Sequence, residues 1–158
     1  MDKIATCLWF DGNAEEAVKF YTGIFSNSRI DDVMYYGEAG PGKAGSVLSM
    51  TFHIEGREFI ALNGGPQFTF TPAISMFVKC ETQAEVDTLW DKLLAGGGTP
   101  VQCGWLTDRY GISWQIVPTV LGMMLRDSDP AKANRVMQAM MQMVKLDVKA
   151  LEAAYAQQ

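Results

Sequence analysis

The sequence predicts an α+β protein built from two similar units, each ordered strand, helix, strand, strand, strand, and followed by a helical tail. Three observations predict this fold class. Short segments with strand character surround two amphipathic stretches of helical spacing, the pattern restarts at residue 73, and beyond Pro118 only helical spacing remains. The 158 residues fit one domain made of two similar halves.

The first unit begins with a strand over 4–10 that turns at Asp11-Gly12. Asn13 and Glu16 have the spacing of a capping box, and the apolar residues that follow recur at helical spacing, which predicts a helix over 13–25. A tight turn at Glu55-Gly56 is expected to join two later strands. The remaining strands are predicted over 29–36, 46–54 and 57–63.

The second unit repeats this order. A strand over 73–80 precedes a second capping box, formed by Thr82 and Glu85, and a helix that the glycines at 96–98 end. Shorter strands are predicted over 99–103, 105–108 and 112–117.

A constant offset of 69 residues supports an internal repeat. It relates Asn13 to Thr82 and Glu16 to Glu85. The same offset carries the apolar stripe Ala17, Phe20, Tyr21 and Ile24 onto Val86, Leu89, Trp90 and Leu93. Agreement of cap, box partner and stripe together indicates two copies of one supersecondary unit.

The tail is predicted to be helical. Residues 121–126 allow one or two turns, Asp129 precedes a proline at a first helical position, and Asp147 is placed to cap a last helix. The stripe Ala133, Met137, Met140, Met141 and Val144 is expected to pack on the body or on a partner subunit, with an adaptable binding surface as the alternative.

Composition excludes several classes of function. Hydrophobic residues at 48% and charged residues at 20% are ordinary globular values, and no apolar run approaches the roughly 20 residues of a membrane span. A net charge of −5 without a Lys or Arg cluster argues against nucleic acid. Three cysteines without CxxC spacing and the absence of a signal-peptide pattern predict a cytoplasmic protein whose cysteines are small buried side chains.

Two apparent motifs point to no chemistry. The loop at 37–45, GEAGPGKAG, matches GxGxxG and most of a Walker loop, but a strand follows it, whereas a phosphate loop must open a helix. We therefore expect a hairpin loop, one that could cover a pocket. His53 is the only imidazole, which cannot make a multi-histidine metal site, so a hydrogen-bonded structural histidine is expected.

With the repeat and these segments in hand, the chain resembles the vicinal oxygen chelate superfamily, which includes glyoxalase I, bleomycin-resistance proteins and extradiol dioxygenases. It is most similar to the PhnB-like branch, often labelled 3-demethylubiquinone-9 3-methyltransferase. The segments that carry the likeness are EEAVKFYTGIF at 15–25, EFIALNGGP at 58–66, CGWLTDRYGISWQIVP at 103–118 and DPAKANRVMQAMMQM at 129–143.

The resemblance implies two βαβββ modules, at 1–66 and 73–118, whose strands form a U-shaped mixed sheet around a pocket, with a tail at 119–158. It also implies a homodimer. In metal-dependent relatives, four His or Glu ligands come from the first and fourth strands of each module. Those positions fall near Thr6, Ala61, Ala73 or Ser75, and Gln115, and the repeat offset favours Ser75 as the partner of Thr6. None is an imidazole or a carboxylate, so we expect no metal and no cofactor.

We therefore predict a binding protein for a small, partly apolar molecule. The predicted ligand-binding residues are Thr6, Leu8, Phe10, Ala61, Ser75, Phe77, Trp114 and Gln115. For Leu8, Phe10 and Phe77 the alternative is simple core packing, and for Gln115 it is a satisfied buried amide.

Three other functions remain open. One is a metal-dependent lyase, isomerase or dioxygenase with a shifted site, such as His53 with a nearby acid. Another is a domain that serves association through its methionine-rich tail. A methyltransferase is less supported, because methyl transfer from S-adenosylmethionine usually relies on a glycine-rich strand-to-helix turn, and the only glycine-rich loop precedes a strand.

Overall fold

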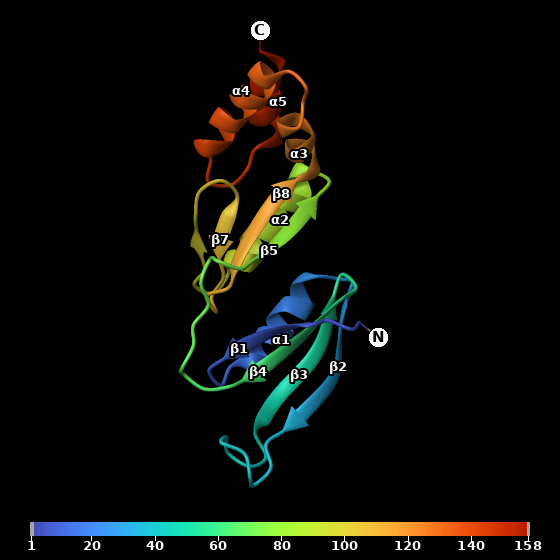
Figure 1. Ribbon diagram of the computed structural model, residues 1–158, viewed down its shortest axis with the longest axis vertical. Coiled ribbons are helices and arrows are strands. Elements are labelled where there is room, and N and C mark those ends of the chain that lie inside the picture. Colours follow the sequence, from blue (N-terminus) through green and yellow to red (C-terminus); the bar gives the residue numbers. More distant parts are fainter. Residues whose placement is uncertain (1, 158) are drawn as a thin grey trace. The chain divides into compact units, whose positions relative to one another are not determined.

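A computed structural model describes residues 2–157 and confirms the α+β fold class. The chain divides into two compact units, Met1–Phe70 and Thr71–Gln158 (Figure 1). Each unit holds one four-stranded sheet with a helix between its first two strands, and the second unit also carries the tail.

The first unit has the predicted βαβββ order. Its strands run β1-β4-β3-β2 across the sheet, with β1 parallel to β4 and the other pairs antiparallel. The predicted tight turn joins β3 to β4, and its residues Glu55 and Gly56 both have positive φ. The elements are β1 (Thr6–Phe10), α1 (Ala14–Ile24), β2 (Ser28–Tyr35), β3 (Val47–Ile54) and β4 (Arg57–Asn63).

The second unit repeats the topology, with strand order β5-β8-β7-β6 and a parallel β5–β8 pair. The strand predicted over 99–103 is much shorter, because the amides of Cys103 and Gly104 donate to the carbonyls of Met143 and Val144, both at 2.8 Å. The elements are β5 (Ser75–Cys80), α2 (Gln83–Leu94), β6 (Thr99–Pro100), β7 (Trp105–Thr107) and β8 (Ser113–Pro118).

One face of each sheet is covered by the helix of its unit, and we call the opposite side the open face. In the first unit the covered face carries Leu8, Phe10, Met50, Phe52, Phe59 and Ala61, all buried, as are Ala14, Ala17, Val18 and Tyr21 of α1. In the second unit it carries Cys80, Leu106, Trp114 and Ile116, together with Val86, Leu89, Trp90 and Leu93 of α2. Because successive residues of a strand alternate, their neighbours occupy the open face.

The 69-residue offset holds for the helices but not for the strands. Two residues, Asp11 and Gly12, separate β1 from the cap of α1, whereas Glu81 alone separates β5 from the cap of α2. The last strand residues, Phe10 and Cys80, are both buried and stand 70 positions apart. Pairing Thr6 with Ser75 by the helix offset was therefore wrong, since a shift of one residue moves a side chain to the other face.

The predicted capping box at Asn13 is also wrong. Asn13 makes no side-chain cap, and the Ala14 amide instead donates to Asn63 Oδ1 at 2.9 Å, while Asn63 Nδ2 donates to the Val47 carbonyl at 3.0 Å. In α2 the predicted cap is confirmed, because Thr82 Oγ1 accepts from the Glu85 amide at 3.2 Å. The start of α1 thus depends on the end of β4.

The tail folds as three helices, α3 (Thr119–Leu125), α4 (Pro130–Met141) and α5 (Val148–Ala156), with the predicted caps at Asp129 and Asp147. Its core consists of Val117, Leu121, Met124, Val136, Leu146 and Leu151. Met137, Met141 and Val144 of the predicted stripe are exposed, and the inward side of α4 is centred on Val136 instead. Figure 1 shows α3 following directly from β8.

We expect Asn63→Ala to lower the free energy of unfolding by about 1–3 kcal/mol, because it leaves the first amide of α1 and the Val47 carbonyl without their partner. The matched variant Asn13→Ala should change it by less than about 0.5 kcal/mol. Urea denaturation of both variants measures the difference. Equal losses would show that Asn13 caps the helix after all.

Candidate functional site

Three predicted ligand-binding residues lie together on the open face of the second unit. Phe77 of β5 is directly opposite Gln115 of β8, and Gln115 Nε2 donates to Ser75 Oγ at 3.0 Å. The Phe77 side chain is 53% exposed, which the core alternative does not explain. Gln115 is satisfied by Ser75 and only half-buried, and its carbonyl oxygen can still accept a hydrogen bond.

A groove of about 300 Å³ continues this face toward the end of the sheet. Its walls are mostly apolar, and its two charged lining residues are both cations, Lys79 and Arg126. The lining residues are Phe77, Lys79, Val117 and Pro118 from the two strands, and Thr119, Gly122, Met123 and Arg126 from α3 and the residue after it. The groove has the size of a small ligand site at the lower end of the usual range.

The other predicted residues lie elsewhere. Leu8, Phe10, Ala61 and Trp114 are buried on the helix-covered faces, and Thr6 is exposed at the start of β1, in line with Leu8. Trp114 is fixed by Asp108, whose Oδ2 accepts from Trp114 Nε1 at 2.9 Å and whose Oδ1 accepts from the amides of Tyr110 and Ile112. For these five residues a role in ligand binding stays a prediction, and their positions favour core packing for Leu8 and Phe10.

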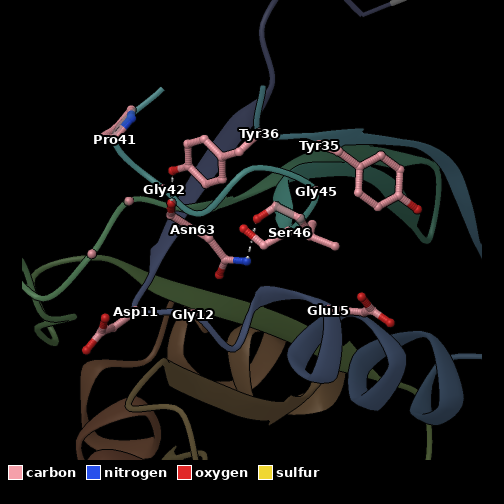
Figure 2. Close-up of a pocket in the computed structure, with 13 residues that line it drawn as sticks. Asp11, Gly12, Glu15, Tyr35, Tyr36, Pro41, Gly42, Gly45, Ser46 and Asn63 are labelled. Atoms are coloured by element: carbon pink, nitrogen blue, oxygen red, sulfur yellow. Dashed lines mark hydrogen bonds between the residues drawn. The ribbon is translucent and has the colours of Figure 1, made fainter. Parts of the chain in front are cut away.

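A second cavity, of about 560 Å³, lies in the first unit between the start of α1 and the hairpin loop at 37–45 (Figure 2). Tyr36 Oη donates to the Asn63 carbonyl. The loop passes so close to the Tyr36 ring that a Cβ at Gly42 would lie 2.3 Å from it. The loop joins β2 to β3 and opens no helix, so the predicted hairpin loop is confirmed and the helix that a nucleotide loop opens is not found there.

This cavity is large, and much of its wall is backbone without side chains. Gly12, Gly42, Gly45, Gly64 and Gly65 contribute much of the lining. The two carboxylates at its rim, Asp11 and Glu15, are exposed, and Glu15 already pairs with Lys19 at 3.0 Å. Figure 2 shows both carboxylates on the side of the α1 turn, away from the loop. We therefore regard the groove of the second unit as the better candidate site.

His53 has a charged partner, as expected for a hydrogen-bonded histidine. Its Nδ1–H donates to Asp31 Oδ2 at 2.5 Å, and Arg29 Nε donates to Asp31 Oδ1 at 2.7 Å. Asp31 is the unpaired residue of a bulge in β2, which allows it to reach across to β3. The hydrogen bond from His53, followed by that from Arg29, holds the pKa of the Asp31 carboxyl below its usual value.

The donors present do not fit a metal ion. Over residues 2–157 no three His, Cys, Asp or Glu side chains gather closely enough to hold one. At the open-face positions of the first unit, Cys7 stands opposite Ile60, as Phe77 stands opposite Gln115. Cys7 is exposed, contrary to the expectation of a buried cysteine, yet partial burial of the thiol raises its pKa and disfavours the thiolate that binds metal.

Sequence reasoning missed Lys79, Arg126 and Trp105. Lys79 follows Phe77 by two residues, so the alternation of β5 could have placed it on the same face. Trp105 of β7 is the partner of Gln115 on the side of β8 opposite to β5. No sequence pattern indicated that Arg126 would line the groove, because its position depends on the direction of α3 after β8. No helix within residues 2–157 is long and apolar enough to span a membrane.

Two sheets of βαβββ topology, each with one helix-covered face, define an α+β protein of the glyoxalase fold. The family model described as 3-demethylubiquinone-9 3-methyltransferase matches residues 2–117. The chain therefore belongs to this PhnB-like family of the vicinal oxygen chelate superfamily. The match ends before the tail, so the segment 129–143, which also suggested the family, lies outside it.

Solved structures agree. A PhnB protein from Bacillus cereus, provisionally described as a 3-demethylubiquinone-9 3-methyltransferase, is 43% identical, with a TM-score of 0.68 over 75% of this chain and 100% of its own. Protein PA1353 from Pseudomonas aeruginosa is 20% identical, with a TM-score of 0.60 over 75% of this chain and 98% of its own. The comparison with curated proteins found no match.

The fosfomycin resistance protein FosX from Listeria monocytogenes, solved with Mn(II) and sulfate, is also similar. It is 16% identical and has a TM-score of 0.52, over 72% of this chain and 90% of its own. At this identity the likeness shows the fold alone.

We expect Asp31→Asn to destabilise the protein at neutral pH, by an amount that shrinks as the pH falls from about 5 to about 2. The lowered pKa means that the unfolded state binds a proton at this carboxyl before the folded state does, so the stabilisation is complete above the ordinary Asp pKa of about 3.9 and is lost below it.

Unfolding curves at several pH values measure this effect. The control is Asp32→Asn, next along β2, whose side chain makes no ion pair in the described part of the chain. A difference between wild type and Asp31→Asn that stays constant with pH would contradict the role of the Asp31 hydrogen bonds.

Proposed function

We propose that this protein binds a small, partly apolar molecule on the open face of β5 and β8, without a bound metal. The observation that carries the proposal is the exposed Phe77 ring, which lines the 300 Å³ groove next to the Ser75–Gln115 pair. An exposed aromatic surface beside a few fixed polar groups is typical of small-molecule sites.

The chemistry of this face supports binding rather than metal-assisted catalysis. Ser75 and Gln115 are neutral donors and acceptors that satisfy each other, and they cannot replace the hydration shell of a divalent ion. They can orient a ligand, because the Gln115 carbonyl oxygen accepts a hydrogen bond while Nε2 is held by Ser75. We infer that the protein binds or sequesters this molecule, and that it does so as a homodimer in the cytoplasm.

The methyltransferase activity in the family's description receives less support. A methyl donor such as S-adenosylmethionine usually binds at a glycine-rich turn from strand to helix, and the glycine-rich loop at 37–45 joins two strands instead. Gly40 and Gly42 are accounted for by their close contact with the Tyr36 ring.

A second candidate function is that of a metal-dependent lyase, isomerase or dioxygenase of the same superfamily with a shifted site, in which His53 would act as acid or base. One observation favours it. Asp31 fixes His53 through Nδ1, which orients Nε2 as a group that can take or give a proton. The His53 side chain is 15% exposed, so only a small part of it is accessible to solvent.

We expect Phe77→Ala to lose a molecule that the wild type retains during gentle purification, because the aromatic surface of the site disappears. Native mass spectrometry measures the retained mass, the oligomeric state and any metal together. Met34→Ala is the matched control, since Met34 is a strand residue of similar exposure in the first unit, 54% against 53%. It should retain the molecule.

Two results would contradict the proposal. Retention of the molecule by Phe77→Ala would place the site elsewhere. About one tightly bound divalent ion per chain, present without affinity-tag nickel and lost in Gln115→Ala, would show that the open face is a metal site.

For the catalytic alternative, His53→Ala should abolish turnover of a substrate while the unfolding midpoint stays within a few degrees of wild type. Asp31→Asn should lower the turnover, because the imidazole loses the carboxylate that orients it. Activity that survives in His53→Ala rules out His53 as the acid or base.

A further inference from the structure

We propose that the ligand of the open face is an amphipathic anion, whose acid group is held by Lys79 and Arg126 while its apolar body lies on Phe77 and Met123. This inference rests on the proposed binding function and adds the chemical class of the ligand. It concerns the groove of about 300 Å³ at the end of β5 and β8.

The chemistry of the open face changes in order along β5, where it runs Ser75, Phe77, Lys79. Opposite these residues stand Ser113, Gln115 and Val117 of β8. Each step of two residues covers about 6.6 Å. Along β5 a hydroxyl, an aromatic ring and an ammonium group therefore span about 13 Å, which is the length of a small molecule with a polar group at each end.

Arg126 reaches the groove because of Gly122. The Arg126 amide donates to the Gly122 carbonyl at 3.2 Å, which places this residue at the end of α3. A Cβ added at Gly122 would lie 3.1 Å from Arg126 Nη1, so the missing side chain is what lets the guanidinium lie against the helix beside the groove. Its planar fork can bind a carboxylate or a phosphate with two hydrogen bonds.

Neither cation has an acidic partner within the part of the chain that the structure describes. No carboxylate lines the groove, although the chain has 18 acidic residues against 13 basic ones. An exposed Lys or Arg alone would be an ordinary solvated charge. Here both border a groove with two exposed apolar side chains, Phe77 at 53% and Met123 at 66%. A ligand that is apolar on one side and anionic on the other complements both features.

One wall of the groove comes from a region outside the family match. The family model ends at residue 117, and Gly122, Met123 and Arg126 all follow it. Of the two cations, Lys79 therefore lies within the family match and Arg126 beyond it.

The test compares two probes of nearly equal shape, 4-phenylbutanoate and its neutral amide, 4-phenylbutanamide. Calorimetric titration should show that the wild type binds the carboxylate at least about tenfold more tightly at low salt, because charge-assisted hydrogen bonds add to the same apolar contact. Added salt should reduce this preference. Inorganic phosphate alone should compete weakly, since it lacks the apolar body.

The double variant Lys79→Gln/Arg126→Gln should lose the preference for the carboxylate and keep the affinity for the amide. The matched control is Lys149→Gln, which removes an exposed charge on α5 outside the groove and should leave both affinities unchanged. Phe77→Ala should weaken both probes, because it removes the contact that they share.

Each other outcome contradicts a specific statement. Equal binding of the two probes by the wild type overturns the anionic class but leaves the proposed function standing. Phosphate that competes as well as the carboxylate overturns the amphipathic class. Binding of neither probe, combined with dimerisation that Phe77→Asp abolishes, would show that a second copy covers the groove and would overturn both proposals.

Discussion

The structure depends on one constraint, which is that a β-strand has two faces and the helix of each unit can cover only one of them. Helix α1 takes the face of Leu8 and Phe10, and α2 takes the face of Cys80 and Ile116. Burial of these residues supplies the hydrophobic stabilisation of each unit. What remains on the open face is the row that alternates with them, and under the proposed function its composition decides what each sheet can bind. The first unit offers Cys7 and Ile60 there, and the second offers Phe77 and Gln115.

That constraint explains which features of the fold could be predicted from the sequence. Order and type of the elements, the turn at Glu55-Gly56 and the cap at Thr82 follow from local spacing, and all were predicted correctly. Local spacing did not show which residues of each strand face the helix. The reason is one extra residue between β1 and α1, which makes the offset between the two units differ by one between their strands and their helices. Ser75, Phe77 and Gln115 lie together on the open face of the second unit, whereas Leu8, Ala61 and Trp114 are buried on the helix-covered faces of their own sheets. Along a strand, a shift of one residue moves a side chain from one face to the other.

The interactions that sequence could not supply are those between residues far apart in the chain. Asn63 caps α1 from 49 positions later, and Asp31 reaches His53 from 22 positions before it. Each requires a particular strand register, and in β2 it requires a bulge as well. Local patterns favoured Asn13 as the cap because the spacing to Glu16 is correct. In the folded chain Asn63 lies at the start of α1 instead, and its side-chain amide also donates to the Val47 carbonyl of β3. Asn13 does not make this second bond.

The two units differ most after their last strands, and this difference bears on function more than the repeat does. After β4 the chain turns back onto its own sheet. Trp9 on the open face donates Nε1–H to the Gly65 carbonyl at 2.8 Å, and its ring meets Phe68 edge-on at 4.9 Å. After β8 the chain enters α3, which is held by the tail core and leaves a groove with two cations. The segment after β4 thus places Phe68 against Trp9 on the open face of the first unit, while Phe77 of the second unit is 53% exposed. Under the proposed function, the segment that follows each of the two similar sheets decides which of them accepts a ligand.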